Sequence, residues 1–247
     1  YLNNSSIESN VVPNYSMIRS HDRGSQDEVI AAAKVANNDQ RISLDNINLE
    51  QLEKGLKYYY EDQLSSTKHY NYYNIPASYA LLLSNKDTVP RVYYSDMYQD
   101  YNQNSPQQYM SKPTIYYSAI DALLKARIKY VAGGQSMSVA KVGNEQNQEV
   151  LTSVRYGKNI MNSNDLGTTE SRTEGMGVIV SNDTDLKLSN SDQIVLHMGA
   201  AHSNQAYQAL MLTNNDGIQI YNSNAPVVWT NQNGDLVFEG NDIQGQE

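Results

Sequence analysis

The chain has 247 residues, of which 39% are hydrophobic, so it is long enough to bury a core as one large domain or two smaller ones. Its 27 acidic and 18 basic residues give a net charge of -9, which argues against a nucleic-acid-binding surface and favours a neutral partner. Without cysteine it can form neither a disulfide nor a thiolate metal site, and its apolar runs are too short to span a membrane.

The first predicted elements are a short strand at residues 15–19 and a helix that opens at Ser25. Ser25 and Glu28 have the spacing of a capping box, in which hydroxyl and carboxylate satisfy free N–H groups at the helix start. His21 and Asp22 therefore lie where a strand turns into a helix, the place where parallel α/β proteins carry their reacting groups. A carboxylate beside an imidazole there can stabilise positive charge, hold a sugar hydroxyl or transfer a proton. The alternative is that Asp22 caps the loop and His21 is an ordinary satisfied polar residue.

Three further helices are predicted before residue 133. One starts near Asn48, one runs from Pro76 to Leu83, and one covers residues 117–131 and stops at Gly133-Gly134. Residues 88–94 have the composition of a strand. This order of strand, helices, strand and helix is typical of βα repeats, although two such units cannot close a barrel of eight.

The opening helix and the last predicted helix have apolar faces that predict how they pack. The expected buried residues are Val29, Ala32, Ala33 and Val35 on the opening helix, and Ile120, Leu123, Leu124 and Ile128 on the last one.

Beyond residue 134 the pattern changes to short runs rich in Val, Ile, Leu and Tyr. The predicted strands are 150–156, 177–181, 193–198, 207–212, 218–221, 226–230 and 235–239. Asp216-Gly217 and Asn233-Gly234 have the chemistry of hairpin turns. We therefore predict an α/β domain over residues 1–133 and an antiparallel all-β domain over residues 134–247.

Two smaller signals are best explained by structure alone. Gly133-Gly134 follows no strand and precedes no Lys-Ser or Lys-Thr, so it is interpreted as a helix stop rather than a phosphate-binding loop. His197 and His202 have no further ligands in a suitable pattern, so they are interpreted as polar strand and loop residues rather than a metal site.

Acidic residues flank the predicted strand at 88–94. Asp87 precedes it, and Asp96 and Asp100 follow it with tyrosines interleaved. Such side chains could line a carbohydrate cleft, but the pattern by itself favours a solvated edge.

Several long stretches resemble a known enzyme family. MIRSHDRGSQDEV is similar to the segment that follows the acid/base glutamate in glucansucrases, glycoside hydrolase family 70. The other similar stretches are NKDTVPRVYYSDMY, LLKARIKYVAGGQSMSV, LTSVRYGKNIM, TEGMGVIVSN and VLHMGAAHSNQAYQAL. The resemblance implies that residues 1–133 form the C-terminal part of a circularly permuted (β/α)8 barrel, and that residues 134–247 form an antiparallel β-sandwich, the family's domain C.

The resemblance also implies an activity. Family members are secreted bacterial enzymes, extracellular or cell-wall associated, that split sucrose and transfer the glucosyl unit with retention to an α-glucan or oligosaccharide acceptor. Retention uses a carboxylate nucleophile and a carboxylic acid on opposite sides of the glycosidic bond. No segment of this chain matches either group, so the chain alone is expected to be inactive. No cofactor or metal is expected within it, whereas calcium is implied for the full enzyme.

Around the first predicted strand the resemblance assigns roles residue by residue. Asp22 matches the transition-state stabiliser, and His21 matches the histidine that holds the glucosyl ring in the donor subsite. Arg19 belongs to the same motif and is expected to brace these groups. Gln26 matches a polar residue near the donor and acceptor subsites.

The remaining assignments concern the sugar platform and the acceptor. Tyr94 matches the aromatic residue under the donor sugar, and Asp87 matches an acidic residue beside it. Arg23, Gly24 and Ser25 occupy the variable triplet that shapes the acceptor site. Many dextran-forming members carry Ser-Glu-Val there, and this triplet is closer to branching sucrases, which decorate an existing dextran. A polymerising sucrase, a branching sucrase, an enzyme for starch-like donors and a non-catalytic sugar-binding or structural module all remain open.

Overall fold

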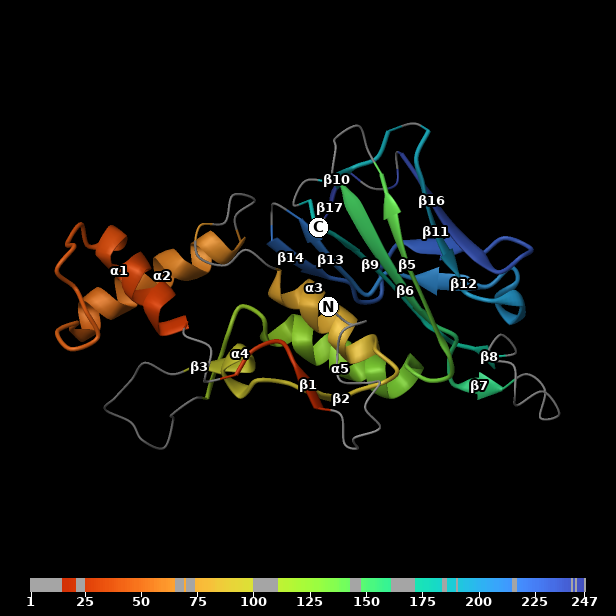
Figure 1. Ribbon diagram of the computed structural model, residues 1–247. Helices are drawn as coiled ribbons and strands as arrows, with labels where there is room; N and C mark the ends of the chain where they lie inside the picture. Colours follow the sequence, from red (N-terminus) through yellow and green to blue (C-terminus); the bar gives the residue numbers. More distant parts are fainter. Residues whose placement is uncertain are drawn as a thin grey trace.

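The computed structural model describes residues 15–20, 25–64, 69, 74–99, 111–142, 148–160, 172–183, 186–189, 191–214, 217–240, 242 and 244–246. Helices dominate up to residue 130, and antiparallel strands dominate from residue 135 (Figure 1). α3 and α5 lie between the strand pair β1–β2 and the larger layer of strands, while α1 and α2 lie side by side at one end. The predicted mixture of helices and sheet is confirmed. The partial barrel, the sandwich and the domain division after residue 133 stay predictions.

The first strand, β1 (Tyr15–Met17), pairs in parallel with β2 (Val89–Arg91). The pair is tied by a hydrogen bond of 2.6 Å from the Thr88 hydroxyl to the Ser16 hydroxyl. Because the strands are parallel, their carboxyl ends meet at one edge. The residues that follow β1 and those that follow β2 are therefore neighbours.

Helices α1 (Ser25–Ala36) and α2 (Leu49–Leu64) pack closely against each other. The contact depends on Gly55, because a Cβ there would lie 2.5 Å from the Cβ of buried Ala33. Any side chain at position 55 would push the two helices apart.

One expectation for α1 is corrected by the structure. Val35, predicted on the buried face, is 49% exposed, because the contact with α2 is narrow and is made by small alanines. Glu28, predicted to cap the helix, accepts a hydrogen bond of 3.0 Å from the Tyr59 hydroxyl of α2. The capping box stays a prediction, because the side chain of Ser25 lies outside the described residues.

Helices α3 (Ile75–Ser84) and α5 (Tyr117–Tyr130) form the centre of the molecule. Asn74 caps α3 by accepting a hydrogen bond of 2.9 Å from the amide of Ala77. The predicted ends of α3 are confirmed. On α5 the expected stripe is interrupted at Ile128, which is 72% exposed, because the helix contacts its neighbours through the earlier turns.

These two helices share one apolar cluster with the strand layer. Its buried members are Ile75, Tyr79, Ala80, Leu82, Leu83, Tyr116, Ile120, Leu123 and Val178. Full burial of a side chain such as Leu or Ile contributes about 1.5–3 kcal/mol. The same cluster therefore holds the helices together and attaches them to the strands.

The segment after β2 departs from the predicted strand 88–94. Only residues 89–91 form a strand, and a helical turn, α4 (Tyr94–Met97), follows. This turn directs Asp96 inward, where it forms a buried ion pair with Arg19. Two short antiparallel strands, β3 (Tyr98–Gln99) and β4 (Lys112–Pro113), come next.

A three-stranded antiparallel sheet begins the strand-rich part. It consists of β5 (Gln135–Lys141), β6 (Glu149–Arg155) and β9 (Met176–Ser181), with β6 in the middle. β5 was not predicted, since its apolar residues Met137 and Val139 lie on an exposed edge strand rather than in the core. A small pair, β7 (Asn159–Ile160) and β8 (Arg172–Thr173), joins β6 to β9.

Most of the remaining strands form antiparallel pairs that are nested along the sequence. From the outermost to the innermost, these are β11 (Gln193–His197) with β16 (Asp235–Glu239), β12 (Ala206–Gln208) with β15 (Val227–Trp229), and β13 (Met211–Asn214) with β14 (Gly217–Ile220). β17 (Gln244–Gln246) lies between β10 (Leu186–Lys187) and β13. A 3-10 turn, η5 (Ala200–His202), connects β11 to β12.

One of the two predicted hairpin turns is confirmed. Residues 215–216 lie outside the described part, but β13 and β14 on either side of them pair as a hairpin. The turn at Asn233-Gly234 instead joins β15 to β16, which pair with different strands. Gly234 has φ +82, and a Cβ there would lie 1.9 Å from the Gly199 carbonyl oxygen. Glycine is required at this position by a close approach between turns rather than by a hairpin.

Candidate functional site

The segment predicted to carry the chemistry lies between β1 and α1. His21, Asp22, Arg23 and Gly24 are outside the described residues, and so is the side chain of Ser25, the first residue of α1. Gln26 is described and is exposed on the first turn of α1. The roles assigned to these residues stay predictions, and the described surroundings show what holds both ends of the segment.

On the strand side, Arg19 forms a buried ion pair with Asp96 of α4. Its Nε donates to Asp96 Oδ1 at 2.7 Å, and its Nη2 donates to the same oxygen. The other carboxylate oxygen accepts a hydrogen bond of 2.5 Å from the hydroxyl of Tyr79 on α3. The side chain of Asp96 is fully buried, so the prediction of a solvated acidic edge is wrong for this residue.

Electrostatic interactions in this network favour the charged form of Arg19. Burial opposes the charge on Arg19, but attraction and hydrogen bonding to Asp96 outweigh burial, so the pKa of the guanidinium is raised. Burial also raises the pKa of Tyr79, and the Asp96 charge raises it further, so this hydroxyl remains a hydrogen-bond donor. The guanidinium is therefore charged, while the phenol near it is neutral.

An aromatic row follows the ion pair. The rings of Tyr94 and Tyr98 stack with centroids 5.0 Å apart, and the ring of Tyr98 lies 5.2 Å from that of Tyr117. Tyr94 is 56% exposed, so its ring is accessible at the edge where β1 and β2 end. An exposed aromatic face with a polar rim suits a sugar ring.

Asp87 lies elsewhere. It precedes β2 whereas Tyr94 follows β2, so the two residues are at opposite ends of that strand. Its carboxylate is half-exposed and pairs with Lys86. The structure thus brings Arg19 and Tyr94 to the same edge but does not bring Asp87 beside them.

The two histidines in the strand part are far from this edge and have different environments. His197 is exposed and lies 2.7 Å from Asp235 through its Nδ1. His202 is fully buried, and its Nε2 lies 2.8 Å from the carbonyl oxygen of Tyr156. Burial lowers the pKa of His202, so the imidazole is held neutral.

Across the described ranges, no three or more His, Asp or Glu side chains gather into a group that could hold a metal ion. The described residues thus offer no fit for the calcium that the family resemblance implies for a full enzyme, and no chemistry is assigned to it in this chain.

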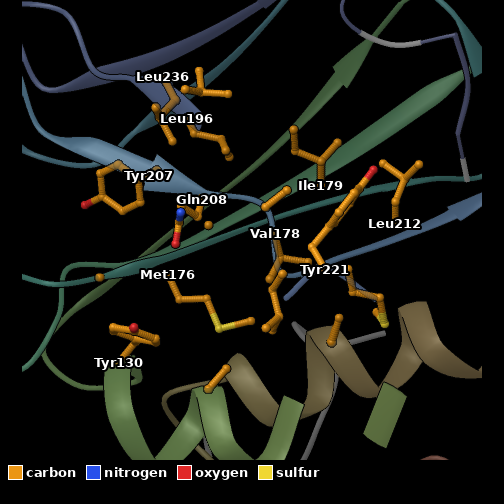
Figure 2. A pocket seen from close by; sticks show the side chains of 18 of the residues that line it. Tyr130, Met176, Val178, Ile179, Leu196, Tyr207, Gln208, Leu212, Tyr221 and Leu236 are labelled. Atoms are coloured by element: carbon orange, nitrogen blue, oxygen red, sulfur yellow. The ribbon is translucent and has the colours of Figure 1, made fainter. Parts of the chain in front are cut away.

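A cavity of about 800 Å³ lies between the central helices and the strands. Figure 2 shows Tyr130 of α5 on one side, and Met176, Val178 and Tyr221 facing the same space. Its lining is mostly apolar and contains none of the residues predicted to bind sugar. The cavity and the candidate site are therefore different places.

Sequence reasoning missed that Asp96 and Tyr79 hold Arg19 beside the candidate site. A partial signal was present, since Arg19 and Asp96 follow two predicted strands of a βα-repeat pattern, which is typical of parallel sheets. Opposite charges at adjacent carboxyl ends are placed to pair.

No helix in the described part of the chain combines the length and apolar character of a membrane span.

Comparison with known proteins gives consistent matches. The model of the family described as Glycosyl hydrolase family 70 matches residues 2–247. Glucosyltransferase-I of Streptococcus mutans is 45% identical over 242 residues, which cover 96% of this chain and 16% of that relative. Glucosyltransferase-I of Streptococcus downei is 41% identical over 244 residues, which cover 96% of this chain and 15% of that relative. The chain thus spans about a sixth of the length of these relatives.

Solved structures agree with these matches. Alternansucrase in complex with isomaltotriose has a TM-score of 0.73 and 46% identity, over 93% of this chain and 20% of that one. Truncated alternansucrase from Leuconostoc mesenteroides has a TM-score of 0.72 and 47% identity, with the same two coverages.

Proposed function

Because the chain belongs to glycosyl hydrolase family 70, we propose that it is part of the catalytic core of a sucrose-dependent transglucosylase. The complete enzyme would release fructose from sucrose and transfer the glucosyl unit, with retention, to an α-glucan or oligosaccharide. We place this reaction outside the cell, where sucrose and the growing glucan meet.

The proposed chemistry divides the work between this chain and the rest of the protein. A retaining transfer uses one carboxylate as nucleophile and one carboxylic acid to protonate the leaving oxygen. We assign both groups to the remainder of the protein. The carboxylate of Asp22 would face the anomeric carbon as positive charge develops there, and His21 would hold the glucosyl ring. A fixed negative charge beside a developing positive charge lowers the barrier without forming a bond.

The observation that carries the proposal is the family match over residues 2–247, which includes the motif from Arg19 to Asp22. The described structure supports it by placing Arg19 at the carboxyl end of a parallel strand, where α/β enzymes hold reacting groups. The exposed ring of Tyr94 at the same edge supports the assignment of a sugar platform. The role of Asp87 in the donor subsite has no such support.

A donor comparison tests the proposal. We expect the complete protein to release fructose from sucrose and to build α-glucan, and to leave maltooligosaccharides unchanged. Fructose and glucan would be measured by chromatography over time. Glucosyl transfer from maltooligosaccharides but not from sucrose would contradict the proposed donor and favour a starch-acting enzyme.

The triplet Arg23, Gly24 and Ser25 favours a second candidate, a branching sucrase. Such an enzyme would add single glucosyl units to an existing dextran, whereas a polymerising enzyme would extend chains from sucrose alone. Linkage analysis of products made with and without added dextran separates the two. Long linear chains formed from sucrose alone would reject the branching candidate.

A non-catalytic module is the alternative outside the enzymes. If residues 1–247 act only as a sugar-binding unit, the isolated chain should bind isomaltooligosaccharides, and the complete protein should not turn over sucrose. Calorimetric titration measures the first property, and the donor comparison measures the second. Sucrose turnover by the isolated chain would contradict our assignment of the nucleophile and acid to the rest of the protein.

A further inference from the structure

Asp96 is a buried ionisable residue to which the proposed reaction gives no role. Both of its carboxylate oxygens are used, Oδ1 by Arg19 and Oδ2 by Tyr79. Its backbone is fixed as well, because its carbonyl oxygen accepts from the Thr114 hydroxyl and its amide donates to the Tyr93 carbonyl at 3.0 Å. The carboxylate therefore has one fixed position.

Tyr79 extends this network to the strand side of α4. Its hydroxyl donates to Asp96 and accepts a hydrogen bond of 3.1 Å from the amide of Tyr93. Tyr79 is itself fully buried on α3, in the central apolar cluster. A side chain of the central apolar cluster thus fixes the carboxylate that binds Arg19.

Arg19 is the point at which this network meets the candidate site. It lies two residues beyond the end of β1 and two residues before His21. Its guanidinium contacts one carboxylate oxygen through both Nε and Nη2, which restricts the side chain. Holding this side chain fixes the described end of the segment two residues before His21.

Stability is a weak explanation for such a pair. Removing two charges from water is costly, and well-packed apolar residues in place of a buried ion pair are often as stable or more so. The ion pair instead holds the two side chains in a single geometry. A reacting group displaced by about 1 Å can lose about 100-fold in rate, so geometry at this place has a functional value.

We propose that Asp96, held by Tyr79, is a positioning residue for the reaction: through Arg19 it sets where β1 delivers His21 and Asp22. This inference rests on the proposed function of those two residues. Asp96 does not touch substrate. It would act through the arginine, so its loss should lower kcat for sucrose more than it raises KM.

The test compares variants of the complete protein. Asp96→Asn keeps the size of the side chain and removes its charge, and we expect kcat for fructose release to fall by about 10- to 100-fold. Tyr79→Phe removes the two hydrogen bonds of the hydroxyl, to Asp96 and from the Tyr93 amide, and keeps the ion pair, and we expect a fall of about fivefold. Because Asp96→Asn could fail to fold, Tyr79→Phe keeps the proposal open to refutation.

Tyr207→Phe is the matched control. Its hydroxyl also hydrogen-bonds a buried partner, His202, but it lies in the strand part, away from β1. We expect this variant to keep the wild-type kcat. Rates for Tyr79→Phe and folded Asp96→Asn that equal the Tyr207→Phe rate would overturn the proposal, whatever happens to melting temperature.

Hydrogen–deuterium exchange separates this inference from the proposed function. Exchange of a peptide covering residues 17–25 should increase in Asp96→Asn and Tyr79→Phe but not in Tyr207→Phe, whether or not the enzyme uses sucrose. Unchanged exchange in both network variants would refute positioning, even with an active enzyme. Failure of the wild-type protein to use sucrose would refute the proposed function alone.

Discussion

The helical part of the molecule buries a charged pair, Arg19 and Asp96, whereas the strand part buries a neutral cluster around His202. Both clusters use a tyrosine hydroxyl, that of Tyr79 in the first and that of Tyr207 in the second. The neutral cluster fixes the η5 turn with hydrogen bonds that carry no desolvated charge. The charged cluster fixes the chain just before the candidate site, at a greater desolvation cost.

This difference suggests what each cluster is for. A turn inside a folded strand layer needs its polar groups satisfied, and neutral partners do that adequately. A segment proposed to present a carboxylate to a sugar needs its approach fixed, and a charged contact through two guanidinium nitrogens restricts direction as well as distance. If the proposed function holds, the cost of the buried charge is placed where geometry matters for the reaction.

The two parts meet at Arg155, where the largest effect on stability is expected. From the end of β6, its guanidinium donates to the carbonyl oxygens of Ser84 and Gly133 at 2.9 Å each, and to that of Gly134 at 3.3 Å. Arg155→Met should destabilise the fold by about 2–5 kcal/mol, because it leaves buried carbonyls without donors. Urea unfolding of the complete protein measures this.

Arg41→Met is the control for this comparison. Arg41 is largely exposed and pairs with nearby Asp39, so its loss should change the unfolding midpoint little. Equal midpoints for the two variants would show that the helical and strand parts do not depend on Arg155 for their attachment.

A smaller and pH-dependent effect is expected at His202. Burial lowers its pKa below the ordinary value of 6.5, so the unfolded chain binds a proton more readily than the folded one. The contribution of His202 to stability is complete above about pH 6.5 and is lost as the pH falls toward the folded-state pKa. Hydrogen exchange of residues 200–208 should therefore accelerate between about pH 7.5 and about pH 5.

Two variants check the origin of that acceleration. His202→Gln should abolish the extra pH dependence of exchange, after correction for the intrinsic exchange rate. His197→Gln should preserve it, because His197 is exposed. If the pH dependence persists in His202→Gln, another group is responsible.

The sequence predicted those elements whose signals are local. α3 and α5 follow from apolar periodicity and from stops at Asn85 and near Gly133, all of which lie within a few residues of the helix ends. β5 was missed because Met137 and Val139 are exposed, so no buried alternation marks it as a strand. Edge strands carry a weak pattern, since burial does not select their residues.

The candidate site was predictable only in part, for a similar reason. The strand before His21 and the helix after it follow from local pattern and from the family resemblance. The burial of Asp96 does not, because its partner Arg19 lies 77 residues away and only the pairing of β1 with β2 brings the two together. The assignments of Asp22, His21 and the triplet stay predictions from the resemblance.

The central claim is that the carboxylate of Asp22 stabilises positive charge on the glucosyl unit during transfer from sucrose. The most direct measurement is kcat for fructose release by the Asp22→Asn variant of the complete protein, with Asp27→Asn on the exposed start of α1 as a control. We predict a loss of about 100- to 1,000-fold for Asp22→Asn and near-normal release for Asp27→Asn. Near-normal fructose release by folded Asp22→Asn would contradict the account.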